Sequence, residues 1–79
     1  MKVRVDITLK PGVLDPQGEA VRHALGALGF DGVQGVRQGK VIELDLATED
    51  ADLAKTQAAQ MAEKLLSNQV IENFTVTVI

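Results

Sequence analysis

Residues 3–16 read VRVDITLKPGVLDP, a stretch that predicts a strand, a loop and the start of a helix. Its first half places an apolar side chain at every second position: Val3, Val5, Ile7 and Leu9. Such alternation of β-branched and polar residues is typical of a half-buried strand. Lys10-Pro11-Gly12 ends the strand, because proline has no N–H to donate to a neighbouring strand.

Asp15 and Pro16 begin a helix that we predict over residues 16–28. The Asp15 carboxylate can accept a free backbone N–H as the N-cap, and the fixed φ of proline suits the first turn. One apolar face follows at helical spacing, formed by Val21, Ala24, Leu25 and Leu28. Gly29 is predicted to adopt the left-handed conformation that ends a helix, with Phe30 packed back onto the helix.

The middle of the chain predicts an irregular strand followed by a regular one. Residues 31–39 contain three glycines, and Val33 and Val36 lie three apart, which breaks strand alternation. We therefore expect a short or bulged strand there, with a tight turn near Gln38-Gly39. Residues 40–47 alternate regularly and predict a second strand. Its apolar positions are Ile42, Leu44 and Leu46.

The last third of the chain predicts a second helix and a final strand. The helix is expected to open at Thr48-Glu49-Asp50, where acidic groups suit the positive end of the helix dipole. Its packing stripe is predicted to be Ala54, Ala58, Met61 and Leu65, and a second contact beside it to be Ala59, Ala62 and Leu66. Asn68 is predicted as a left-handed C-cap. Residues 73–78 alternate again and predict the last strand.

The predicted order is β-α-β-β-α-β, an α+β fold with a ferredoxin-like arrangement. We expect an antiparallel sheet with two helices on one face, in which the two middle strands form either separate strands or one bent hairpin. Residues 1–79 show no repeat or linker, so a single domain is predicted.

Composition predicts a chain that relies on a partner subunit. With 79 residues and no cysteine, it has a small core and neither a disulfide nor a thiolate to stabilise it. The missing cysteines fit a reducing cytoplasm. We therefore expect a homodimer or a tetramer, and a dimer that extends the sheet would protect its edges.

Charge and composition exclude two classes of partner. The formal net charge is −3, and the only aromatic residues are Phe30 and Phe74. An acidic chain with almost no stacking side chains predicts no nucleic-acid binding. The apolar runs are too short to cross a bilayer and the N-terminus lacks the apolar core of a signal peptide, which predicts no membrane association.

No catalytic, cofactor-binding or metal-binding constellation can be assembled from the residues. His23 is the only histidine, and it faces away from the apolar stripe of its helix. The acidic Glu49, Asp50 and Asp52 are explained as helix capping. Residues 35–40 resemble a phosphate loop only faintly, because Val41 replaces the required Ser or Thr and a strand follows instead of a helix.

The loop at residues 10–18 is the richest candidate for a site. It is longer than a simple connection needs, and a rigid loop with an N-cap leaves Gln17 and Gly18 unexplained. Because glycine in a first turn costs about 1 kcal/mol, Gly18 predicts a close backbone approach. Arg37 and Lys40 lie close together and can hold an anionic group of a partner. The predicted partner-contact residues are Lys10, Gly12, Asp15, Gln17, Gly18, Arg37, Gly39 and Lys40.

The chain resembles the small PurS subunit family of bacterial phosphoribosylformylglycinamidine synthase. The most specific motif is Leu9-Lys10-x-Gly12-Val13-Leu14-Asp15-Pro16-Gln17-Gly18. Weaker motifs are Ala24-Leu25-x-x-Leu28-Gly29-Phe30, Val36-Arg37-x-Gly39-Lys40 and Met61-x-Glu63-Lys64-Leu65-Leu66-x-Asn68-x-Val70-Ile71-Glu72. The resemblance covers the whole chain. One departure is Gln69, where many relatives are expected to have proline.

The resemblance implies a non-catalytic accessory subunit in de novo purine biosynthesis. In such a complex an ATP-dependent synthetase subunit activates the amide oxygen of formylglycinamide ribonucleotide, and a glutaminase subunit releases the ammonia that replaces it. The small subunit is expected to dimerise, to join the other two and to assist ammonia transfer. It is expected to carry no cofactor, while ATP and magnesium bind to the synthetase subunit.

Two other functions compete with this interpretation. A regulatory module of the ACT type shares the predicted element order, and Pro11-Gly12-Val13-Leu14 resembles its ligand loop. A small acylphosphatase-like enzyme shares the frame, but residues 10–18 contain no arginine. The first remains the alternative, and the second is disfavoured.

Overall fold

The computed structural model describes all 79 residues and contains one antiparallel sheet with two helices. The strands lie in the order β2-β1-β3, so the N-terminal strand is central. The predicted antiparallel α+β class is confirmed. No helix is both long and apolar enough to cross a membrane. The elements are β1 (Lys2–Leu9), α1 (Pro16–Ala27), β2 (Lys40–Asp45), α2 (Ala51–Met61), the π-helical η1 (Ala62–Leu66) and β3 (Glu72–Val78).

The core lies between α2 and one face of the sheet. Val5 of β1 pairs with Ile42 of β2 and Val76 of β3, so the apolar side chains of all three strands share a face. Alanines on α2 and η1 let the helix lie close to this face. The fully buried core residues are Val3, Val5, Ile7, Ala54, Ala58 and Ala62. At the sheet end, the Met1 amino group donates to the Leu46 carbonyl oxygen at 2.7 Å.

The predicted packing stripe of the second helix is half wrong. Ala54 and Ala58 are buried, but Met61 is 38% exposed and Leu65 is 82% exposed. Ala62, which was predicted beside the stripe, takes the third buried position instead. For Leu65 the reason is the π-helical turn η1, whose wider winding rotates this side chain out of the contact.

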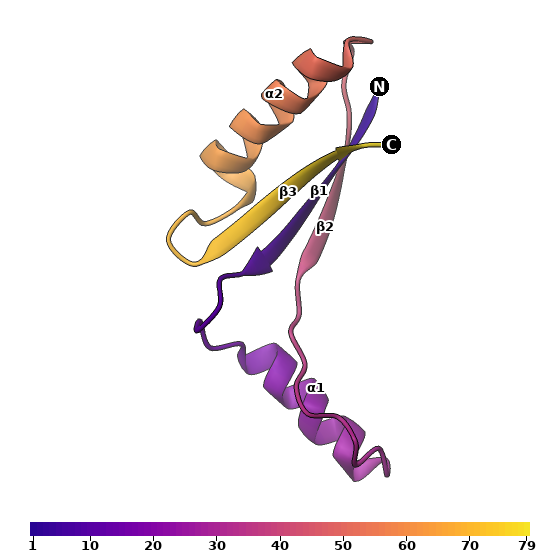
Figure 1. Cartoon of the computed structure of the whole chain (residues 1–79), viewed down its shortest axis with the longest axis vertical. Coiled ribbons are helices and arrows are strands. Elements are labelled where there is room, and N and C mark those ends of the chain that lie inside the picture. Colours follow the sequence, from indigo (N-terminus) through magenta and orange to yellow (C-terminus); the bar gives the residue numbers. More distant parts are fainter.

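The structure corrects the predicted position of the first helix. Figure 1 shows α1 beyond the end of the sheet, with the returning segment 30–39 beside it, and not on the face that α2 covers. We call residues 16–39 the arm. The arm stretches the molecule to 48 × 25 × 14 Å. An apolar stripe indicates that one face of a helix is packed against another surface. The pattern does not identify that surface as the sheet of the same chain or as another subunit.

Residues 31–39 form no strand, which corrects the predicted fourth strand and its hairpin turn. Gly32, Gly35 and Gly39 favour irregular backbone here, and the two valines cannot face one side of a sheet. β2 begins only at Lys40, where regular alternation starts.

The ends of α1 match the prediction, whereas the end of the second helix does not. Gly29 has φ +98°, its N–H donates to Gly26 O, and the Phe30 N–H donates to Leu25 O, which together form a Schellman cap. Asn68 has no positive φ, so the predicted left-handed cap is wrong there. Its side-chain oxygen instead accepts the Val70 N–H and forms an Asx turn.

Candidate functional site

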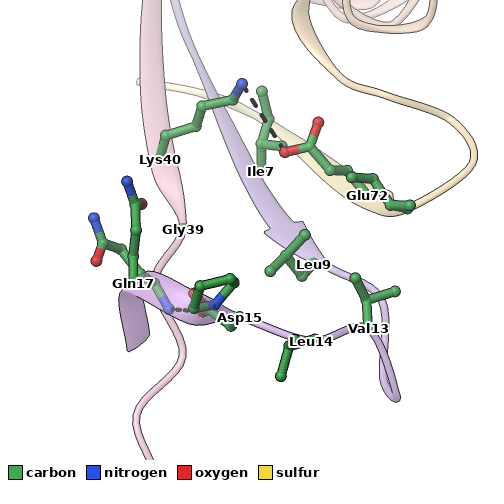
Figure 2. A pocket seen from close by; sticks show the side chains of 12 residues that line it. Ile7, Leu9, Val13, Leu14, Asp15, Gln17, Gly39, Lys40 and Glu72 are labelled. Atoms are coloured by element: carbon green, nitrogen blue, oxygen red, sulfur yellow. Dashed lines mark hydrogen bonds and ion pairs between the residues drawn. The ribbon is translucent and has the colours of Figure 1, made fainter. Parts of the chain in front are cut away.

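Three segments that are distant in the sequence meet where the sheet gives way to the arm. They are the loop 10–18 after β1, the segment 36–40 that enters β2, and the turn 68–72 that enters β3. We call this junction the elbow. Figure 2 shows its side chains arranged around a cavity. All eight predicted partner-contact residues lie on the first two segments, so the structure brings the predicted set together.

Asp15 joins the start of the arm to its return. The residue is 7% exposed, and its carboxylate accepts the Gly18 N–H at 2.8 Å and the Gln38 N–H at 2.7 Å. The Gln38 and Gly18 N–H groups, with the nearby Arg37 charge, hold the pKa of Asp15 below its ordinary value. The predicted N-cap is confirmed, and the same carboxylate also anchors a residue 23 positions later.

Two glycines allow the backbones at the elbow to touch. A Cβ on Gly18 would lie 2.4 Å from the Val36 carbonyl oxygen, and a Cβ on Gly39 would lie 2.7 Å from the Ile7 carbonyl oxygen. Both distances are far below van der Waals contact. The close approach predicted at Gly18 is confirmed, and Gly39 makes a similar one.

Two cations hold the loop by binding backbone oxygens. The Arg37 guanidinium donates to Val13 O at 2.8 Å and to Lys10 O at 3.3 Å. The Lys10 ammonium donates to Gln69 O at 2.9 Å. The backbone carbonyl at Gln69, the departure from the family pattern, is therefore part of the elbow.

A cavity of about 450 Å³ opens between the three segments. Its floor is aliphatic and includes Ile7, Leu9 and Ile71. Its polar side chains include Gln17 and Lys40, and the Lys40 ammonium lies 3.9 Å from a carboxylate oxygen of Glu72. Figure 2 shows this ion pair beside Ile7.

Sequence reasoning missed the third segment of the elbow. Glu72, Gln69 and Ile71 reach the cavity or its loop only because β3 pairs with β1, which places Glu72 opposite Leu9. The Val70-Ile71-Glu72 motif was the one available signal. The sequence alone did not show which segment this motif contacts, because that depends on the register of β3 with β1.

The cavity at the elbow is lined by aliphatic residues, two glutamines, two carboxylates and a lysine, which can bind a partner through apolar contact, hydrogen bonds and charge. It contains no serine, cysteine or histidine among the lining residues. No group of three His, Asp or Glu residues in the chain is placed to hold a metal ion. His23 lies on α1 with its side chain 73% exposed, 3.6 Å from Glu19, which confirms that it faces solvent.

The chain is similar in sequence to small synthase subunits. The PurS family model, described as phosphoribosylformylglycinamidine (FGAM) synthase, matches residues 2–79. The phosphoribosylformylglycinamidine synthase subunit PurS of Synechocystis is 51% identical over 71 residues, covering 90% of this chain and 71% of that protein. The same subunit of Bacillus subtilis is 49% identical over 73 residues, covering 92% and 86%.

Solved structures show the same fold. The Bacillus subtilis PurS crystal structure has TM-score 0.85 at 47% identity, over 96% of this chain and 94% of that one. A chain of the PurLQS structure from Thermotoga maritima has TM-score 0.88 at 29% identity, over 99% and 95%. Because the arm is nearly a third of the chain, such agreement requires a similarly extended arm in those proteins.

Proposed function

The chain belongs to the PurS family, the small subunits of phosphoribosylformylglycinamidine synthase in purine biosynthesis, and from this we propose that it joins the synthetase and glutaminase subunits and assists ammonia transfer. The observation that carries the proposal is the close match to a chain of the PurLQS structure. The comparisons give no support to the alternative of an ACT-type regulatory module.

The residues of the chain support a binding role. Its only histidine is solvated and it contains no cysteine, so it offers no cysteine nucleophile for a glutaminase reaction. In this proposal the chain carries no cofactor, and ATP and magnesium bind to the synthetase subunit in the cytoplasm. Ammonia that escapes into water is diluted and mostly protonated to unreactive ammonium, and a tightly fitting subunit contributes to a seal that prevents this loss.

Reconstitution tests the proposal. The purified chain, mixed with its synthetase and glutaminase subunits, is expected to elute with both in one peak on size-exclusion chromatography with light scattering. Glutamine-dependent product formation should require the chain, whereas product formation from added ammonium chloride should depend on it much less. A chain that elutes alone and leaves the glutamine-dependent rate unchanged would contradict the proposal.

Self-association through the arm is the second part of the proposal. The apolar stripe of α1 is only partly covered within the chain: Leu25 is half-buried, but Val21 is 41% exposed and Leu28 is 73% exposed. On the sheet, α2 packs mainly on β3 and β1, and the apolar residues of β2, such as Ile42 and Leu44, are only partly buried. In a homodimer, α1 of one copy would cover the β2 side of the other and complete the two-helix layer.

Leu28→Glu is expected to break this dimer, because a carboxylate cannot be buried in an apolar interface without a partner. We expect the dimer dissociation constant to rise about 100-fold or more, corresponding to roughly 3 kcal/mol. Light scattering over a dilution series measures it. His23→Glu places the same carboxylate on the opposite face of α1 and should leave the dimer intact. Equal masses for Leu28→Glu and the wild type at every dilution would show that the arm is not the interface.

A further inference from the structure

We propose that the elbow cavity and the cations around it are the seat for an acidic, partly aliphatic segment of another subunit of the synthase. This inference rests on the proposed function and deepens it, because it names the surface of this chain that a partner occupies and the chemistry of the partner segment. It is distinct from the α1 stripe, which a second copy of the chain would cover.

The elbow is a positive surface on an acidic chain. Lys10, Arg37 and Lys40 are three of only eight Lys and Arg residues in a chain of net charge −3. Lys10 and Arg37 donate to neutral backbone carbonyls and form no ion pair. Their hydrogen bonds fix the side chains without placing either cation in direct contact with a carboxylate, which favours an anionic partner.

The two carboxylates at the elbow do not cancel this charge at the surface. Asp15 is nearly buried, and both its oxygens accept backbone N–H groups. The Glu72 side chain is 17% exposed, and one of its oxygens accepts the Asn68 N–H at 2.7 Å. The groups that solvent meets at this junction are therefore mainly the cations.

Two side chains over the cavity have hydrogen-bonding capacity to spare. The Lys40 ammonium has three donors, and its distance of 3.9 Å to Glu72 is longer than a hydrogen bond. The Gln17 side chain is exposed and forms no hydrogen bond within the chain. Its amide both donates and accepts, which matches a peptide group. Gln17 has no capping or packing role in the chain, and in this proposal its side-chain amide binds a peptide group of the partner segment.

The remaining lining favours a protein segment over a small anion. Leu14, 78% exposed, joins the aliphatic floor of the cavity, so an aliphatic side chain beside the incoming carboxylate would bury apolar surface. A phosphate would seek the free N–H groups at the start of α1. The Gly18 N–H there already donates to the Asp15 carboxylate and is not free for a phosphate. The seat therefore suits a peptide with an Asp or Glu next to an aliphatic residue.

Charge reversal at Lys40 tests the inference. The Lys40→Glu chain should bind the isolated synthetase or glutaminase subunit about ten-fold more weakly than the wild type, with a smaller dependence of affinity on salt. Lys55→Glu makes the same charge change on an exposed position of α2 and should bind like the wild type. Gln17→Ala should weaken binding without changing the salt dependence. Calorimetry at two sodium chloride concentrations measures all four proteins, and circular dichroism checks their folding.

The possible outcomes separate this inference from the proposed function. If the wild type binds neither subunit, the proposed function fails together with the inference. If the wild type binds and both Lys40→Glu and Gln17→Ala match Lys55→Glu, the inference alone is overturned. It is also overturned if inorganic phosphate displaces the partner from the wild type more strongly than sodium chloride of equal ionic strength, because the seat would then be a phosphate site.

Discussion

Gly18→Ala is expected to lower the free energy of unfolding by about 1–3 kcal/mol, as overpacking does in a tightly packed core. The added Cβ would lie 2.4 Å from the Val36 carbonyl oxygen and 2.8 Å from an Asp15 carboxylate oxygen. Neither atom is the free end of a flexible side chain, since one is backbone and the other belongs to a carboxylate whose two oxygens each accept a backbone N–H. The elbow must open for the methyl group to fit.

The same helix contains a matched control for this substitution. A Cβ on Gly26 meets nothing within 4 Å. Because alanine favours the helix over glycine, Gly26→Ala should raise the free energy of unfolding by about 1 kcal/mol. Chemical denaturation at one fixed protomer concentration compares the two variants with the wild type. Equal effects of the two substitutions would show that the close approach at Gly18 does not exist in solution.

Asp15→Ala is the second substitution with a large expected effect. It removes the acceptor of two backbone N–H groups on different segments, and one of those bonds is buried. Asp50 caps α2 from an exposed position, with bonds to the N–H groups of Asp52 and Leu53. We expect Asp15→Ala to lower the denaturation midpoint roughly twice as much as Asp50→Ala. A smaller effect for Asp15 than for Asp50 would contradict the anchoring role.

The pH dependence of stability provides a second measurement of the Asp15 anchor. The pKa of this carboxyl is lower in the folded chain than its unfolded value of about 3.9, chiefly through the Gln38 and Gly18 N–H groups. Its contribution is therefore complete above the unfolded pKa and is lost as the pH falls through the folded pKa. Asp15→Asn should flatten the decline in stability below about pH 4. An unchanged decline would assign the acid sensitivity to other carboxyl groups.

Patterns that repeat over a few residues predicted this structure well. Alternation placed β1, and the caps at Asp15 and Gly29 placed both ends of α1. The misplacement of α1 has a physical cause, which is that contact between distant segments leaves no local pattern. The stripe of α1 did not reveal that the helix lies off the sheet, and helical spacing did not reveal the π turn that replaces Leu65 with Ala62.

The residues of the candidate site also fall into those that a local pattern predicted and those that depend on contacts between distant segments. Asp15 and Gly18 were found because a cap and an unexplained glycine stand out within one loop. Gln38 and Glu72, which complete the elbow, depend on how the chain returns and on the register of β3 with β1. The predicted partner-contact residues proved to be neighbours, and several also hold the elbow together.

The arm that lies off the sheet changes what a chain of this length can reach. A compact domain of this length has a radius of gyration of about 12 Å. The observed value is 15.9 Å. The protein thus has an elongated shape, whose opposite ends can touch surfaces that a rounded molecule of equal mass would leave apart, with the elbow setting the angle between them.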